Sequence, residues 1–254
     1  MGKIIAVVNQ KGGVGKTTTA VNLTAALTEA GKRVLLCDFD PQANATSGLG
    51  LDKRNLRHSV YDVVINDVPA REAIVQTKFG DVLPSTADLA GAGVELVTMD
   101  SPNYRLKKAL DTIKDQYDLI FIDCPPSLEL LTLNSLCAAD GIMVPVQCEY
   151  YALEGLSDLL TTVRLVKRSL NPSIALEGVL LTMFDSRTNL SLQVAEEVKR
   201  HFAGQVFATV IPRNVRLSEA PSHGKPITAY DPYSRGADAY RRLADEMVSK
   251  HLSK

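Results

Sequence analysis

The sequence predicts a single α/β domain, built on a mostly parallel, twisted sheet with helices on both faces. Two observations carry this prediction. Apolar runs rich in β-branched residues alternate with helical stretches along the chain, which implies right-handed crossovers between parallel strands. No linker divides the 254 residues. We therefore expect residues 1–254 to form one domain, with 43–100 as a helical and loop excursion within it.

The first predicted elements surround a glycine-rich stretch. The run KIIAVVN (3–9) is continuously apolar, as expected for a strand buried on both faces. Residues 16 to about 30 carry apolar side chains at helical spacing, and Gly31 is placed to end that helix. The run RVLLCDFD (33–40) predicts a second buried strand, which ends in acidic residues.

The rest of the chain repeats the pattern. The predicted strands are DLIFIDCPP (118–126), DGIMVPV (140–146), LEGVLLTMF (176–184) and VFATVIP (206–212). A helical segment, 127–139, lies between the first two of these. The last predicted helix, about 235–250, has Ala237, Tyr240, Ala244 and Met247 on one face. In such folds ligands gather at the carboxyl ends of the strands, where the best motifs fall.

Composition favours a cytoplasmic protein. The formal net charge is −1, so nucleic-acid affinity would require a local basic patch. No run approaches the ~18 apolar residues needed to span a bilayer. The four cysteines are scattered without metal-binding spacing, and we expect buried, reduced thiols.

The stretch GGVGKTT (12–18) has the context of a phosphate-binding P-loop, because it follows a predicted strand and opens a predicted helix. Its glycines let backbone N–H groups turn toward a phosphate, and the helix N-terminus adds partial positive charge. Lys16 would reach the β- and γ-phosphates, and the Thr17 hydroxyl would ligate Mg²⁺. The motif predicts a P-loop NTPase.

One departure from the usual P-loop pattern is informative. The first glycine of that pattern is replaced by Gln10, and Lys11 follows. Together with DFDPQ (38–42) and DCPP (123–126), this "deviant" Walker A form resembles the ParA/MinD group of ATPases. Three further stretches resemble its Soj/ParA chromosome-partitioning branch: QCEYYALEGL (147–156), LLTMFDSRTNLS (180–191) and RNVRLSEAPSHGKPI (213–227). The resemblance covers nearly the whole chain and is weakest at 51–80 and after 235.

The resemblance implies that Lys11 is a signature lysine, which crosses a dimer interface to the phosphates held by the other subunit. This would supply cationic charge in trans, as an arginine finger does. The alternative is that Lys11 is an ordinary solvent-exposed lysine in a loop. The family thus implies a homodimer that forms on ATP.

Three acids are candidates for catalysis and for the magnesium site. Asp40 resembles the residue that orients the attacking water, and Asp38 would support the Mg²⁺ shell through water. Either acid could instead be a plain cap of a helix or turn. Asp123 ends an apolar run of Walker B form, so we expect it to hold Mg²⁺ directly or through water.

The family resemblance also implies an adenine site lined by Pro212 and Asn214. The complete set of expected ATP-binding residues is Lys11, Gly12, Gly13, Val14, Gly15, Lys16, Thr17, Thr18, Pro212 and Asn214. Lys11, Lys16 and Asp40 are the expected catalytic residues.

The sequence leaves open several hypotheses about what the ATP-bound dimer binds. Arg187 and Arg216 match arginines of the Soj branch credited with binding double-stranded DNA non-specifically. Each could instead be an ordinary solvated charge. The further basic residues Lys199, Arg200, Arg213 and Lys225 are candidates for additional phosphate contacts.

Two alternatives to DNA binding are membrane binding and electron transfer. A MinD-like membrane switch that positions cell division requires a C-terminal amphipathic helix with bulky apolar residues, and the tail has Ala and Met but no Phe or Trp. We expect that tail to dock on the protein body, without membrane binding. An electron donor like the nitrogenase iron protein requires paired cysteine loops, and none is evident.

The sequence therefore predicts a cytoplasmic, nucleoid-associated ATPase with slow intrinsic turnover that uses ATP and Mg²⁺. Its ATP dimer would bind DNA and drive chromosome or plasmid segregation. A centromere-binding partner of the ParB/Spo0J type, expected from the family, would stimulate hydrolysis.

Overall fold

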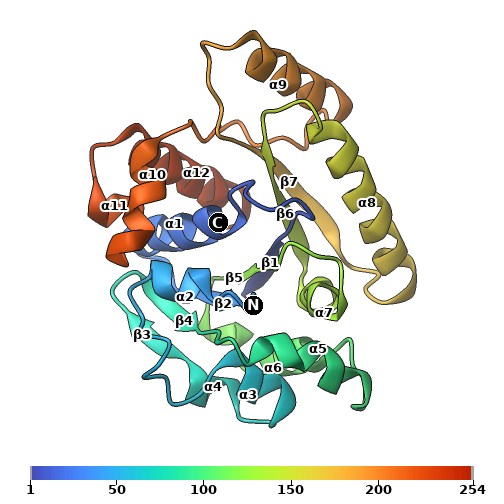
Figure 1. Cartoon of the computed structure of the whole chain (residues 1–254). Coiled ribbons are helices and arrows are strands. Elements are labelled where there is room, and N and C mark those ends of the chain that lie inside the picture. Colours follow the sequence, from blue (N-terminus) through green and yellow to red (C-terminus); the bar gives the residue numbers. More distant parts are fainter. Residues whose placement is uncertain (1, 253–254) are drawn as a thin grey trace.

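The computed structural model describes residues 2–252 and has the predicted α/β architecture (Figure 1). The strands are β1 (Lys3–Val7), β2 (Val34–Asp38), β3 (Val75–Thr77), β4 (Gly80–Leu83), β5 (Leu119–Asp123), β6 (Gly141–Gln147) and β7 (Ala175–Thr182). Within the described residues they form one sheet in the order β3-β4-β2-β5-β1-β6-β7. All neighbours are parallel except β3 and β4, so the sheet is mostly parallel as predicted.

Helices cover both faces of this sheet (Figure 1). They are α1 (Lys16–Glu29), α2 (Asn44–Gly48), α3 (Val60–Ile65), α4 (Ala70–Ala73), α5 (Leu89–Val97), α6 (Arg105–Asp111), α7 (Leu130–Ala138), α8 (Ala152–Ser169), α9 (Asn189–His201), α10 (Val215–Glu219), α11 (Ile227–Tyr230) and α12 (Arg235–His251), with short 3₁₀ turns η1 (Lys114–Gln116) and η2 (Ala220–His223). None of the helices within 2–252 has the length and apolar character needed to cross a bilayer.

The continuous apolar runs are explained by two separate cores. Successive side chains of a strand point to opposite faces. Ile4 and Ala6 of β1 accordingly join a core formed with α3 and α5–α9. Ile5 and Val7 join a second core formed with α1, α2 and α10–α12. Each strand must be apolar on both faces, which distinguishes it from the alternating pattern of a half-exposed strand.

The prediction of a strand at VFATVIP (206–212) is wrong. The segment runs beside β7 but forms only isolated bridges, at Val206 and at Pro212. The reason is that two backbone N–H groups in its middle, those of Ala208 and Thr209, donate to the carboxylate of Glu246 on α12, at 2.8 and 3.0 Å. These donors are therefore not available for a continuous ladder.

The short pair β3–β4 has no counterpart among the strands expected from the sequence. Each strand has only three or four residues, and β3 is half exposed, so neither produces a long apolar run. β4 pairs parallel to β2, and β3 returns antiparallel to form the edge of the sheet. The pair lies within the 43–100 excursion, which otherwise consists of short helices and turns.

The last helix docks on the body of the protein. Its predicted apolar face is buried, including Tyr240 and Met247, and the Tyr240 hydroxyl lies 3.3 Å from the hydroxyl of Thr19 on α1. All four cysteines are buried and unpaired, as expected.

A buried carboxylate fastens the end of α12 to the sheet. Glu177 on β7 is 3% exposed at its side chain and lies 2.6 Å from Lys3 Nζ, 2.9 Å from Lys250 Nζ and 2.5 Å from His251 Nε2. Although burial acts in the opposite direction, hydrogen bonds from Lys250 and Lys3 lower its pKa to about 2. The ionised form is therefore stabilised in the folded protein.

We expect Glu177→Gln to lower the free energy of unfolding at neutral pH by about 2 kcal/mol, because it removes a buried ionic partner of three groups, which themselves retain some contact with water. A folded pKa below the unfolded one adds stability that is present above about pH 4.5 and lost as pH falls toward 2. Urea unfolding of both proteins at pH 7, 4 and 3 should therefore give a difference that shrinks with acid. A constant difference would contradict this role of ionised Glu177.

Candidate nucleotide-binding site

The predicted P-loop connects β1 to α1 at the carboxyl edge of the sheet (Figure 1). Gly13 and Gly15 have positive φ angles of 76° and 93°, a conformation that glycine adopts without a steric penalty. The Thr182 hydroxyl, at the end of β7, donates to the Val14 carbonyl at 2.8 Å and so supports the loop from outside. No sequence pattern indicates this contact, because the two residues are 168 positions apart.

Lys16 lies inside the loop that it follows. Its Nζ donates to the carbonyl oxygen of Lys11 at 3.0 Å, and the residue is only 7% exposed. Burial lowers the pKa of Lys16, whereas the charge of nearby Asp123 acts in the opposite direction. A buried ammonium with two N–H donors left over is suited to an anionic ligand.

Asp123 lies at the carboxyl end of β5, opposite Val7 of β1 on one side and Asp38 of β2 on the other. It is completely buried, and neither of its side-chain oxygens has a hydrogen-bond partner of normal geometry within residues 2–252. Burial, and then the proximity of Asp38, raise its pKa well above the ordinary value, although Thr17 partly offsets this. A buried, unpaired carboxylate requires either a proton or a cation.

Asp38 is also completely buried, but its carboxylate is well satisfied. Oδ2 accepts from both the backbone N–H and the hydroxyl of Thr46 at 2.7 Å, and Oδ1 accepts from the Asp40 N–H at 3.3 Å. Burial raises the pKa of Asp38 to about 6 despite these bonds. Because Thr46 lies in the first turn of α2, the contacts match the capping alternative for Asp38, and its link to Mg²⁺ stays a prediction.

Asp40 follows β2 and is 7% exposed. Its Oδ1 accepts from the Gln42 N–H at 2.9 Å, and its carbonyl accepts from the Ser85 hydroxyl at 2.8 Å. Its Oδ2 makes no hydrogen bond to the described residues. One oxygen thus fixes the side chain in a turn while the other is available to a ligand or water, so capping and a water-orienting role are compatible.

A cavity of about 340 Å³ adjoins the P-loop on the side away from these acids. Gly15 and Thr18 form one wall, and Pro212 and Asn214 belong to the other. The structure therefore brings together the two predicted adenine residues and the P-loop. The lining residues that sequence reasoning missed are Thr182, Met183, Ile211, Arg213, Leu217, Ser218, Pro221 and Tyr240. Six of them lie in the stretches 180–191 and 213–227, which resemble the Soj/ParA branch, but nothing in those stretches indicates which side chains face the cavity.

Lys11 does not point into this site. Its side chain is 47% exposed and forms an ion pair with Glu149, in the loop between β6 and α8. The next two residues, Tyr150 and Tyr151, are 77% and 64% exposed large side chains. The predicted signature lysine therefore lies on an open surface that also presents two aromatic rings.

Arg187 and Arg216 lie on different segments of the surface, each in an ion pair. Arg187 contacts Asp185 at 2.7 Å, and Arg216 contacts Glu219 at 2.8 Å and Asp231 at 3.5 Å. Arg216 lies on α10, whose N-cap is Asn214 from the adenine-side cavity. Both arginine side chains are more than half exposed and are accessible to a large polyanion.

The comparisons with known proteins cover the whole chain. A family model described as an AAA domain matches residues 2–176. The sporulation initiation inhibitor protein Soj of Bacillus subtilis (strain 168) is 61% identical over 98% of this chain and 99% of its own length. The chromosome partitioning protein ParA of Myxococcus xanthus (strain DK1622) is 54% identical over 100% of this chain and 90% of its own.

Solved structures with the same fold include nucleotide-bound proteins. A cobyrinic acid a,c-diamide synthase from Mycobacterium smegmatis with bound ADP and magnesium is 41% identical, with a TM-score of 0.87 over 100% of this chain and 96% of that one. The cell division ATPase MinD of Pyrococcus furiosus is 29% identical, with a TM-score of 0.81 over 98% of this chain and 100% of that one. The P-loop NTPase fold and the full-length identities agree: this chain belongs to the Soj/ParA family of chromosome-partitioning ATPases.

Proposed function

We propose that this protein is an ATP- and Mg²⁺-dependent switch, which dimerises on ATP, binds DNA without sequence preference and is reset by hydrolysis. The observation that carries the proposal is the buried, unpaired carboxylate of Asp123 beside Lys16 and the P-loop. These groups have the charges and hydrogen-bonding capacity for a magnesium-bound triphosphate. The nucleotide-bound M. smegmatis structure, which contains ADP and magnesium, supports the choice of ligand.

The proposed nucleotide lies along the P-loop, with its base in the 340 Å³ cavity between Thr18 and Asn214. The cavity is large enough for a purine ring, and its mixed apolar and polar lining suits a flat heterocycle. Backbone N–H groups of Gly12–Thr18 face the phosphates, and Lys16 gives up its bond to the Lys11 carbonyl to reach the β- and γ-phosphates.

The residues present fit a magnesium ion. Asp123 supplies an oxygen ligand without a competing hydrogen bond, and Thr17 lies close enough to affect its pKa. No cluster of three or more acidic, histidine or cysteine side chains that could hold a metal exists within residues 2–252, so phosphate oxygens and water would complete the six ligands. When bound, the ion neutralises charge on the γ-phosphate.

Hydrolysis is proposed to depend on Asp40. The free Oδ2 of Asp40 would accept a hydrogen bond from the attacking water, while the bond from Gln42 N–H to Oδ1 keeps the side chain in place. Lys16, and Lys11 from the other subunit, would stabilise the charge that develops on the phosphoryl group. Slow intrinsic turnover is proposed from family membership alone.

Dimerisation is proposed to occur through the surface that carries Lys11. To reach the nucleotide of the other subunit, Lys11 must leave Glu149. It would then exchange one negatively charged partner, a carboxylate, for another, a phosphate. The bound triphosphate carries more negative charge than one carboxylate, so ATP favours the exchange.

The ATP-bound dimer is proposed to bind DNA, with Arg187 and Arg216 contacting backbone phosphates. Arg187 would exchange Asp185 for a phosphate, and Arg216 would exchange Glu219 and Asp231. A dimer doubles the number of contacts. A ParB-type partner that stimulates hydrolysis is proposed from family membership alone.

Asp40→Ala should lower ATP turnover at saturating ATP by at least about 100-fold, because the attacking water is no longer oriented, while ATP-dependent dimers persist. Phosphate release and sedimentation velocity measure the two properties. The control is Asp115→Ala, which removes an exposed acid far from the P-loop. Undiminished turnover in the Asp40 variant would remove Asp40 from this role.

Arg216→Ala should weaken ATP-dependent retention on duplex DNA of arbitrary sequence at low salt. The slope of log affinity against log salt should fall by about 0.9 for each DNA phosphate that the variant no longer neutralises. Co-sedimentation with DNA or with anionic liposomes, with and without ATP, measures binding. The matched control is Arg54→Ala, another exposed arginine paired with an acid. Binding to liposomes in place of DNA would favour the MinD-like membrane alternative and contradict the proposal.

A further inference from the structure

A second cavity within the described residues lies away from the nucleotide site, in the 43–116 region. Its volume is about 560 Å³, within the range of small-molecule sites. Ile113 and Gln116, which form one end, directly precede β5, whereas the P-loop follows the carboxyl end of β1. Because β1 and β5 are parallel and in register, this cavity lies toward the amino ends of the strands, whereas the P-loop cavity lies toward their carboxyl ends.

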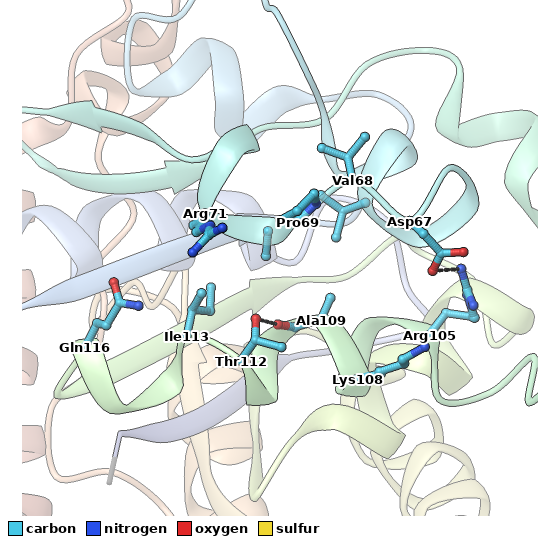
Figure 2. A pocket seen from close by; sticks show the side chains of 12 residues that line it. Asp67, Val68, Pro69, Arg71, Arg105, Lys108, Ala109, Thr112, Ile113 and Gln116 are labelled. Atoms are coloured by element: carbon cyan, nitrogen blue, oxygen red, sulfur yellow. Dashed lines mark hydrogen bonds and ion pairs between the residues drawn. The ribbon is translucent and has the colours of Figure 1, made fainter.

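The cavity has two walls (Figure 2). One is the connection from α3 to α4, including Val68 and Pro69, together with the start of α4 at Ala70. The other is α6 with the turn that follows it. Apolar groups from both walls form much of the lining, among them Ala109 and Ile113. This lining suits an apolar body of one ring or a short chain.

Three cations and a single acid belong to the lining: Arg71, Arg105, Lys108 and Asp67. Arg105 is 11% exposed at its side chain and is held by two hydrogen bonds, from Nε to the Val64 carbonyl at 2.9 Å and from Nη2 to Asp67 at 2.5 Å. Its Nη1 donates to no described residue. Thus a nearly buried arginine is fixed in the wall with donors left over.

The acid is already paired, and two of the cations are not. Asp67 is bound to Arg105, whereas the side chains of Arg71 and Lys108 make no hydrogen bond or ion pair within residues 2–252. In Figure 2 Arg71 comes from one wall and Lys108 from the other. Each wall therefore has a cation without an acidic partner, although the whole chain has a net charge of −1.

We propose that this cavity binds a small organic anion, in which an apolar body carries a carboxylate or phosphate group. The apolar part lies against Val68, Ala109 and Ile113, and the anionic group accepts hydrogen bonds from Arg105 and Lys108. Arg71 lies at the Ile113 and Gln116 end of the cavity and adds positive charge there (Figure 2). The site does not depend on the proposed ATPase function, since it shares no lining residue with the P-loop cavity.

The test uses anilinonaphthalene sulfonate, an apolar anion whose fluorescence rises on binding, with the full chain and saturating ADP and Mg²⁺ to occupy the other cavity. Arg71→Gln combined with Lys108→Gln should weaken binding at least about tenfold, because the charge-assisted hydrogen bond from Lys108 and the positive charge at the Arg71 end of the cavity are both removed. The matched control changes Lys167 and Arg168 to Gln, two exposed cations on α8 outside this cavity. Ala109→Trp fills the cavity without changing charge and should have the same effect as the double substitution of Arg71 and Lys108.

Displacement of the probe identifies the ligand class. Phenyl phosphate or benzoate should displace it, and which of the two does so at lower concentration tells a phosphate from a carboxylate site. Inorganic phosphate and benzyl alcohol, which each lack one half of the ligand, should displace it poorly. Absence of probe binding, equal weakening in the α8 control, an unchanged affinity in the Arg71 and Lys108 double variant, or equal displacement by inorganic phosphate would each overturn the proposal.

Discussion

The arrangement of the site depends on burying two carboxylates side by side at the ends of neighbouring strands. Asp38 and Asp123 are directly opposite each other on β2 and β5, and both are inaccessible to solvent. Such a pair is costly unless hydrogen bonds, protons or cations compensate it. Asp38 receives three hydrogen bonds, but Asp123 has only the nearby charge of Lys16 and the Thr17 side chain. The unequal compensation leaves Asp123 suited to a metal ion and Asp38 to structural support.

This compensation connects the site to the rest of the fold. The donors to Asp38 come from Thr46 of α2, whose hydroxyl in turn accepts from the Ser85 N–H at 2.9 Å. The Ser85 hydroxyl donates to the Asp40 carbonyl. The excursion that contains β3 and β4 therefore supports the loop that carries Asp40. In the proposed switch, a change in charge at Asp123 would act first on Asp38, which lies opposite it, and through Thr46 and Ser85 on the loop that carries Asp40.

Much of the fold can be predicted from the sequence because its signals are local. The run before the P-loop, the first helix and its end at Gly31, and the buried face of α12 all follow from periodicity and turn chemistry, and the structure confirms them. The strand expected at VFATVIP is wrong because its composition suits a strand, whereas a distant residue, Glu246, takes its backbone donors. The P-loop and Asp123 follow from motif and position. Their supports, Thr46 and Thr182, and the ion pair between Lys11 and Glu149 depend on contacts between distant segments, which no local pattern records.

In the proposed mechanism ATP joins two chains through Lys11, and sedimentation velocity with Mg²⁺ and a non-hydrolysable ATP analogue tests this role of Lys11. The wild-type chain should change from monomer to dimer on adding the analogue, and Lys11→Ala should remain a monomer while a fluorescent analogue still binds to it. A Lys11→Ala protein that dimerises as well as the wild type would contradict the role of Lys11. A wild-type chain that stays monomeric with the analogue bound would contradict dimerisation on ATP.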